Sequence, residues 1–236
     1  MESPRSTLAS SSKRSTGCSE SSRSSSTGNG IEIPADPRVG RIPARLIFLR
    51  SGENNLIMLY QKIFLFGIDK SGKTTLSQAL RTGSYEGDIF PTIDFDVRAL
   101  FLQHFKESIE FKVWDAPGQV KYRNDWDEGY KAANLMLFVV DTAEDDRFGE
   151  VKTTLEGVLN KEDAAGVPLI FLFHKIDLEK AKENYYKAMD YFKPTLIPGR
   201  DVYILHTSVK DQRTLDDVKE AIAIIVEKSR LRPASA

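Results

Sequence analysis

The chain of 236 residues contains a single cysteine, Cys18. This excludes an internal disulfide and any metal site built from several thiolates, and it suits a reducing compartment. No apolar run reaches the roughly 20 residues that cross a bilayer, because the nearest, 46–66, is interrupted by Arg50, Glu53 and Lys62. An excess of positive charge is also missing, since 33 Lys and Arg oppose 34 Asp and Glu, so no nucleic-acid partner is expected. We therefore expect a cytoplasmic protein with no transmembrane segment, whose contact with an internal membrane, if any, is peripheral.

Residues 1–40 differ in composition from the rest of the chain. Twelve of the first thirty residues are Ser, and a segment with so little to bury is expected to be a disordered, solvated Ser-rich tail open to phosphorylation. A transit peptide is the alternative, because the tail is rich in Ser and Arg and poor in acids. Glu2 follows the initiator Met and no cysteine lies near the C-terminus, so neither N-myristoylation nor prenylation is expected. Residues 41–60 form an N-terminal extension, either extra strands or a surface helix, and residues 231–236 a C-terminal tail.

Between residues 61 and 230, apolar strand-like runs alternate with helical patterns. Continuous apolar runs predict buried strands, and apolar residues at 3.6-residue spacing predict helices. The predicted strands are 62–66, 135–140, 169–173 and 202–205, with a pair at 96–102 and 108–114, and the clearest predicted helices cover 148–159 and 215–226. Thr214 and Asp217 resemble a capping box that opens the last helix. This alternation predicts an α/β fold with a mostly parallel six-stranded sheet and helices on both faces.

A complete G-x-x-x-x-G-K-[ST] phosphate loop directly follows the first strand and precedes a helical pattern. Its residues are Gly67, Ile68, Asp69, Lys70, Ser71, Gly72, Lys73 and Thr74. In such a loop the backbone N–H groups surround phosphate, the lysine reaches the β- and γ-phosphates, and the hydroxyl of Thr74 binds Mg²⁺. Thr75, at the start of the helix, is included among the predicted nucleotide contacts. A glycine-rich surface turn is the ordinary alternative, and the flanking strand and helix disfavour it. The fold is therefore predicted to be that of a phosphate-loop NTPase.

Two further segments predict contacts to Mg²⁺ and the γ-phosphate. A D-x-x-G-Q motif follows the strand that ends at Trp114: Asp115 can hold Mg²⁺, Gly118 lets its N–H approach the γ-phosphate, and Gln119 can orient an attacking water. Thr92, in a polar connection, can complete the Mg²⁺ shell only when a γ-phosphate is present, as a switch residue does. Alone, each motif could be an ordinary turn; downstream of a phosphate loop they predict one site.

The ends of two later strands predict a site for the base. After the strand at 169–173 comes His174-Lys175-Ile176-Asp177, in which the carboxylate of Asp177 can accept both N–H donors of guanine. The stem of Lys175 can cover the face of the base. After the last strand, Ser208, Val209 and Lys210 can offer backbone N–H to guanine O6.

In this order and at these spacings, the motifs resemble those of small GTPases of the Ras superfamily over residues 61–230. The W-D-x-x-G-Q and P-T-I-x-F-x-V sequences resemble the Arf branch, whereas His174 and Pro117 resemble the Rag/Gtr branch. The resemblance implies a molecular switch that binds GTP or GDP with Mg²⁺ and hydrolyses GTP. It implies catalytic roles for Gln119 and Lys73. The implied Mg²⁺ ligands are Thr74, Thr92 and Asp115.

The resemblance also implies partners: effectors, exchange factors and GTPase-activating proteins, with a heterodimer with a related GTPase as a further option. Phe95 and Trp114 lie in the region where Arf proteins meet effectors. No arginine is placed by the sequence as a finger acting in cis, because position 70 is Lys and Arg98 lies in a predicted strand. The main alternative is a GTP-binding pseudo-GTPase that acts as a scaffold with little hydrolysis. A metabolic phosphate-loop kinase is a weaker alternative, because it leaves the His-Lys-x-Asp motif unexplained.

Overall fold

The computed structural model describes residues 61–85, 90–104 and 107–231. The Ser-rich tail, the extension at 41–60 and residues 232–236 of the predicted C-terminal tail lie outside this part of the chain.

The described residues form one six-stranded sheet in the order β2-β3-β1-β4-β5-β6. Its strands are β1 (Gln61–Phe66), β2 (Asp96–His104), β3 (Glu107–Asp115), β4 (Leu135–Asp141), β5 (Leu169–His174) and β6 (Val202–His206). Only the β2–β3 pair is antiparallel, and the other four pairings are parallel. The predicted mostly parallel six-stranded sheet is confirmed, and each strand lies within two residues of its predicted bounds.

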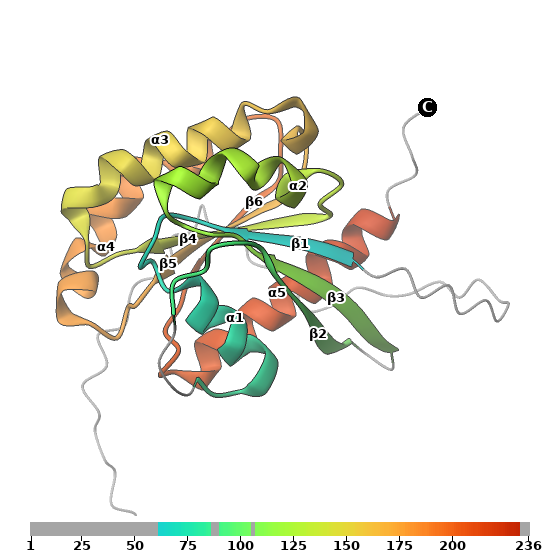
Figure 1. Cartoon of the computed structure of the whole chain (residues 1–236). Helices are drawn as coiled ribbons and strands as arrows, with labels where there is room; N and C mark the ends of the chain where they lie inside the picture. The colour runs from blue at the N-terminus through green and yellow to red at the C-terminus, as the bar shows by residue number, and fades with distance from the viewer. Residues whose placement is uncertain (1–60, 86–89, 105–106, 232–236) are drawn as a thin grey trace, which may run out of the picture. The chain divides into compact units, whose positions relative to one another are not determined.

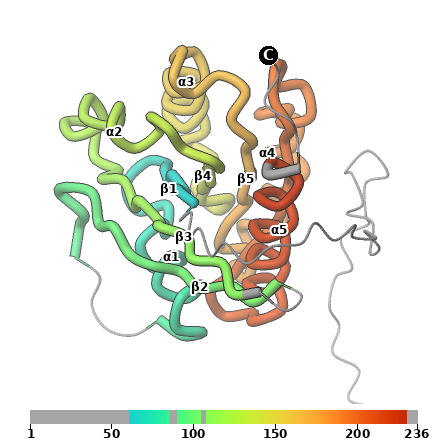
Figure 2. The backbone as a smooth tube through the Cα atoms, turned by 90° about the vertical axis from the view of Figure 1, so that its right-hand side faces the viewer, coloured from blue at the N-terminus to red at the C-terminus, as the bar shows by residue number. Residues whose placement is uncertain are grey.

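Helices cover both faces of this sheet, as predicted (Figure 1). The helices are α1 (Lys73–Thr82), α2 (Asp127–Tyr130), α3 (Phe148–Leu159), α4 (Glu179–Phe192) and α5 (Gln212–Leu231), with 3-10 turns at η1 (Val120–Trp126), η2 (Asp145–Arg147), η3 (Glu162–Ala164) and η4 (Pro194–Leu196). Figure 1 shows α2 and α3 above the sheet and α1 and α5 below it, and the tube in Figure 2, turned by 90°, again shows α3 above β1 and α1 below it. In the described part of the chain, no helix has the length and apolarity to cross a membrane.

The two faces of β1 show why the sheet needs both helical layers. Ile63 and Leu65 belong to a cluster with α1 and α5, whereas Phe64 and Phe66 belong to a second cluster with α2, α3 and α4. All four side chains are fully buried, as the two-residue period of a strand covered on both faces requires. The rings of Phe64 and Phe66 stack at 4.8 Å, and Trp126 of η1 packs edge-on against both. This aromatic contact anchors η1 to the sheet.

Two local features differ from the sequence analysis. The last helix begins at Gln212, and the carboxylate of Asp211 accepts the N–H of Arg213 at 3.1 Å, so the capping box proposed for Thr214 and Asp217 is wrong. The N–H of Ser208 instead donates to the Thr214 hydroxyl, which ties the loop after β6 to the helix. Helix α4 was not predicted, because it buries only Ala181, Ala188 and Phe192 and its other side chains are mainly polar.

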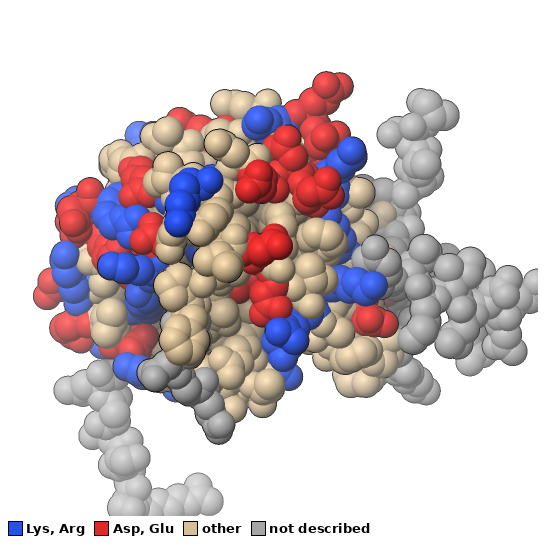
Figure 3. All heavy atoms as spheres, in the orientation of Figure 1, with Lys and Arg blue, Asp and Glu red and all other residues tan. Residues whose placement is uncertain are grey.

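The surface in Figure 3 carries Lys and Arg interspersed with Asp and Glu. This mixture agrees with the formal net charge of −1 for the whole chain.

Candidate nucleotide-binding site

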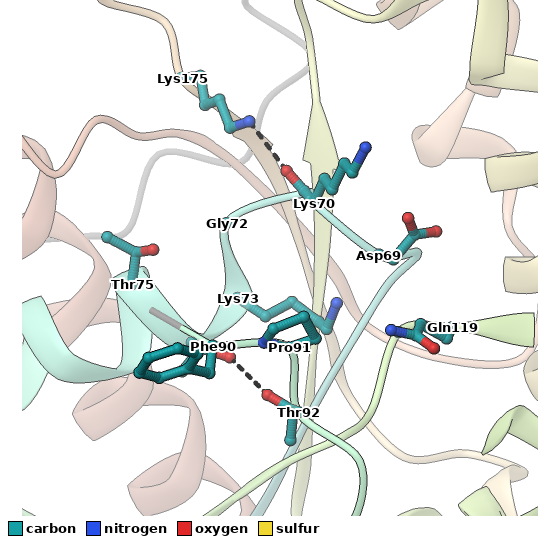
Figure 4. A pocket seen from close by; sticks show the side chains of 12 residues that line it. Asp69, Lys70, Gly72, Lys73, Thr75, Phe90, Pro91, Thr92, Gln119 and Lys175 are labelled. Carbon is teal, nitrogen blue, oxygen red and sulfur yellow. Dashed lines mark hydrogen bonds between the residues drawn. The ribbon is translucent and has the colours of Figure 1, made fainter. Parts of the chain in front are cut away.

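Four of the predicted motifs follow the carboxyl ends of β1, β3, β5 and β6, which the parallel pairing brings to one edge of the sheet, whereas Thr92 lies in the connection before β2. Open α/β sheets bind ligands outside this edge. A pocket of about 310 Å³ lies there, which is within the size range of small-molecule sites. Its lining residues are Asp69, Lys70, Gly72, Lys73, Thr74, Thr75, Phe90, Pro91, Thr92, Gly118, Gln119 and Lys175. Figure 4 shows the loop from Asp69 to Lys73 along one wall, with Gln119 and Thr92 approaching from other segments.

The phosphate loop is built for close approach of its backbone. Gly72 has φ of +93°, and a Cβ at this position would lie 2.7 Å from the ring of His174, so only glycine fits. Gly67 begins the loop after β1, and the hydroxyl of Ser71 donates to the carbonyl of Ile68 at 2.9 Å. Lys70 also adopts a left-handed conformation, with φ of +61°. Such conformations in non-glycine residues concentrate at functional sites.

Lys73 places a buried ammonium in this loop. The group donates to the carbonyl of Ile68 at 2.6 Å, and only 5% of the residue is exposed. Burial lowers the pKa of Lys73 to about 8, and the charge of Asp115 partly opposes the shift. A buried cation interacts strongly with an anionic phosphate, because little water screens the two charges.

Asp115 and two hydroxyls provide a donor set that fits Mg²⁺. Both carboxylate oxygens of Asp115 are buried and have no hydrogen-bond partner within 3.5 Å. Burial raises the pKa of Asp115 to about 6, although the nearby Thr74 hydroxyl and the charge of Lys73 oppose the shift. The hydroxyls of Thr74 and Thr92 lie 3.0 Å apart. The described residues contain no cluster of three or more His, Cys, Asp and Glu side chains that could hold a metal. Mg²⁺ is typically held by one or two carboxylates together with substrate phosphates, so this sparse oxygen set suits it.

The loop after β3 rests directly on the phosphate loop. A Cβ on Gly118 would lie 2.6 Å from both the backbone nitrogen of Asp69 and the ammonium of Lys73. The preceding Pro117 is buried, and its carbonyl accepts the indole N–H of Trp126 at 2.9 Å. Gln119 lies at the edge of the pocket, on the same side as Asp69 in Figure 4.

The predicted base contacts also gather, beside the pocket. The carboxylate of Asp177 accepts the hydroxyl of Ser208 at 2.7 Å and pairs with the ammonium of Lys210 at 2.9 Å. Burial raises the pKa of Asp177, but the hydrogen bonds from Lys210 and Ser208 outweigh it, so the pKa lies below its usual value. The N–H of Lys210 donates to the Ser208 hydroxyl at 3.0 Å, and Val209 between them packs on the core. Asp177 is thus held as a carboxylate at this edge of the sheet.

His174 and Lys175 connect the base side to the phosphate loop. Nδ1 of His174 lies 2.6 Å from the hydroxyl of Thr207, and the other edge of the ring packs against Gly72. Burial, aided by the charge of Lys175, lowers the pKa of His174 to about 4, so the ring is neutral near pH 7. The ammonium of Lys175 donates to the carbonyl of Lys70 at 2.9 Å and pairs with Asp141 at 2.6 Å. The phosphate loop is therefore braced by both residues.

Three charged residues that belong to none of the predicted motifs lie beside the phosphate loop. Arg147 pairs with the carboxylate of Asp69 at 2.7 Å, although 78 residues separate them. Glu150 of α3 accepts from both Arg147 and Arg123, at 2.8 and 2.6 Å. No local motif marks these residues, because only the fold brings η1, η2 and α3 to the loop. The sequence prediction concerned only an arginine finger acting in cis; the structure places Arg123 and Arg147 beside the loop, and both are paired with carboxylates.

Comparison with known proteins identifies the class. The model of the ADP-ribosylation factor family matches residues 54–228, and the chain belongs to this family of small GTPases. The Arf-like part of the resemblance is thereby confirmed.

Individual relatives agree with this assignment. ADP-ribosylation factor-like protein 8d of Arabidopsis thaliana is 30% identical over 168 residues, covering 70% of this chain and 92% of the relative. Protein 8b of the same plant is 31% identical over 157 residues, covering 66% and 83%. Among solved structures, the Arl6 BBS3 small GTPase of Trypanosoma brucei, which contains the bound nucleotide analogue GppNp, superposes with a TM-score of 0.62 at 21% identity, covering 72% of this chain and 98% of that one. This last likeness supports the phosphate-loop NTPase fold.

Proposed function

We propose that this protein is a guanine-nucleotide-dependent molecular switch that binds GTP with Mg²⁺ and hydrolyses it to GDP. The main observation behind the proposal is that the phosphate loop and the segment of the predicted base contacts are connected in the structure. The phosphate loop carries the buried Lys73 near the buried carboxylate of Asp115, and His174 and Lys175, which directly precede the segment of Asp177, contact the loop at Gly72 and Lys70. Membership of the Arf family supports the same reading.

Each residue of the phosphate half-site has a distinct role in this proposal. Backbone N–H groups of the loop and the Lys73 ammonium bind the β- and γ-phosphates. Mg²⁺, held by Thr74, Thr92 and Asp115, would neutralise charge on the phosphates. Gly118 presents its N–H to the γ-phosphate, and Gln119 orients the attacking water. Loss of the γ-phosphate removes the contacts of Thr92 and Gly118, so both loops relax.

Base selection is assigned to Asp177, with the backbone of Ser208, Val209 and Lys210 as the proposed partners of guanine O6. The N–H groups of Ser208 and Lys210 bond to hydroxyl oxygens, so Val209 is the proposed donor among the three. A carboxylate pairs with the two N–H donors of guanine, whereas adenine presents it with a lone pair. Sites that recognise a ligand through such buried hydrogen bonds can discriminate against the wrong ligand by a factor of about 10⁴–10⁵.

The test of guanine binding is a titration of the purified full-length protein with labelled GTP, GDP, ATP and XTP, with and without Mg²⁺. We expect guanine nucleotides to bind and ATP not to compete. Asp177→Asn should lower affinity for GDP by about 10²-fold, because a carboxylate acceptor is lost, and should raise affinity for xanthine nucleotides. Asp216→Asn makes the same chemical change on the exposed side of α5 and should leave both affinities unchanged. Wild-type protein that binds ATP as tightly as GTP would refute the assignment.

Hydrolysis is tested separately, by phosphate release from preloaded GTP in a single turnover. The pseudo-GTPase alternative predicts retained GTP without phosphate release. His174 packs on Gly72 and bonds to Thr207, so the histidine at this position braces the phosphate loop, and we expect phosphate release.

Partners and location belong to the same proposal. Phe95 and Trp114 lie together with ring centroids 5.5 Å apart, and both are partly exposed. We propose this pair as part of the surface that effectors contact. Regulation by exchange factors and GTPase-activating proteins, a heterodimer with a related GTPase suggested by the Rag-like residues His174 and Pro117, and a cytoplasmic or peripheral membrane location remain predictions.

A further inference from the structure

The two peptide groups on either side of Gly118 are each held by a side chain from η1. Trp126 donates its indole N–H to the carbonyl of Pro117 at 2.9 Å, and Nε of Arg123 donates to the carbonyl of Gly118 at 2.8 Å. Because a peptide group is planar, fixing its C=O also fixes the direction of its N–H. The N–H groups of Gly118 and Gln119 therefore have set directions.

Arg123 is itself connected to the phosphate loop through charged side chains. Its Nη2 donates to Glu150 at 2.6 Å, and Glu150 accepts from Arg147 at 2.8 Å. Arg147 donates to the phosphate loop twice, to the carboxylate of Asp69 at 2.7 Å and to its backbone carbonyl at 3.1 Å. We call Asp69, Arg123, Arg147 and Glu150 the charge latch. Its residues lie in the phosphate loop, η1, η2 and α3, and Arg123 of η1 connects them to Gly118.

The latch is shielded enough from water for its geometry to matter. The side chains of Arg123 and Arg147 are 14% and 24% exposed. Burial raises the pKa values of Asp69 and Glu150, but the arginine contacts outweigh it, and both pKa values lie below their usual range. Hydrogen bonds between charged groups are stronger than neutral ones, and an arginine can direct several donors from one rigid plane. Each link therefore favours one position of the Gly118–Gln119 loop.

We propose that Arg123 is a positioning residue which, through the charge latch and its bond to the Gly118 carbonyl, holds Gly118 and the peptide group that follows it against the phosphate loop and so favours GTP over GDP. The observation that singles it out is its bridging place, with one nitrogen on Gly118 and another on Glu150. The proposal rests on the proposed function, because it concerns the response of the same site to the γ-phosphate. It requires no direct contact between Arg123 and the nucleotide.

The test compares the dissociation constants of fluorescent GDP and of a non-hydrolysable GTP analogue, both with Mg²⁺, on full-length protein. Arg123→Ala should shift the ratio of the two constants by about tenfold towards GDP, with the GDP constant within about twofold of wild type, because the charge-assisted hydrogen bond to the Gly118 carbonyl is lost. Glu150→Gln removes a charge while nearly keeping the shape of the side chain, and it should shift the ratio in the same direction. If Arg123→Ala does not fold, Glu150→Gln provides the test of the latch. Lys187→Ala, which removes a surface pair with Asp145, is the matched control and should change nothing.

Arg123→Lys separates geometry from charge. A lysine has a single nitrogen and cannot reproduce the paired contacts with Gly118 and Glu150, so it should resemble Arg123→Ala. A wild-type ratio in Arg123→Lys would overturn the geometric role of Arg123. A wild-type ratio in both Arg123→Ala and Glu150→Gln would overturn the role of the latch and leave the proposed function intact. Wild-type protein that binds neither nucleotide would overturn the proposed function and the latch together.

Discussion

Replacing Gly118 by alanine should separate GTP binding from GDP binding. The added Cβ would lie 2.6 Å from the backbone nitrogen of Asp69 and 2.7 Å from its Cα. Lys73, also 2.6 Å away, has a flexible side chain that can move. The backbone of Asp69 has less freedom, because Arg147 holds its carbonyl and its carboxylate. The loop that carries residue 118 must therefore retreat.

The expected loss of GTP affinity follows from the overlap between the added Cβ and the backbone of Asp69. Relief to an ordinary contact of 3.4 Å needs a movement of about 0.8 Å. Overfilling a packed site by one methyl group costs about 1–3 kcal/mol, which corresponds to a shift of about 5–150-fold between the two loop positions. GTP affinity should fall by this factor. GDP makes no γ-phosphate contact, so its affinity should stay close to that of wild type.

The assay is a fluorescence titration of full-length Gly118→Ala with GDP and a non-hydrolysable GTP analogue, supported by a thermal melt to show that the variant folds. Gly157→Ala is the control, because nothing lies within 4 Å of a Cβ at that position in α3. It should bind both nucleotides normally and gain up to about 1 kcal/mol of stability from helix propensity. If Gly118→Ala bound the GTP analogue within twofold of wild type, the close contact of Gly118 with the phosphate loop would be refuted.

Two further predictions concern single side chains. Gln119→Leu should slow single-turnover GTP hydrolysis by at least about 10-fold while nucleotide affinity is kept, because the residue orients water and does not hold phosphate; unchanged phosphate release would remove that role. His174 has a pKa of about 4 in the folded protein, below its ordinary 6.5, so the unfolded chain binds the proton first as pH falls. The stability present above pH 6.5 should therefore decline by roughly 3 kcal/mol down to pH 4. In urea denaturation at these two pH values, with the nucleotide state matched, His174→Asn should lose this part of the decline; an equal decline in both proteins would contradict the burial of a neutral ring.

The sheet was predictable because its signals are local. Strands β1, β4 and β5 are buried on both faces, so each had to be a continuous apolar run. Helix α3 matches its predicted bounds of 148–159 because its apolar residues repeat at helical spacing on one face. Helix α4 gave no such signal, since alanines are small enough to be buried without forming an apolar stripe.

Sequence alone also placed the phosphate loop, because eight consecutive residues and their flanking elements contain the whole pattern. It could name Asp115, Thr92 and Asp177 as candidates, and their roles stay predictions. The tertiary structure decided which side chains meet: Asp177 with Ser208 and Lys210, and His174 with Gly72. It also decided the cap of α5, where Asp211 takes the place expected for Thr214.

The charge latch is the clearest example of contacts that the sequence could not predict and only the tertiary structure shows. Arg123, Arg147 and Glu150 are ordinary charged residues in their own segments, and nothing in their local sequence points to Asp69. The stacking of β1 against η1 and α3 brings them together. Backbone patterns are specified by neighbours in the chain, whereas contacts between long polar side chains depend on the relative placement of whole elements, and only the folded structure contains that information.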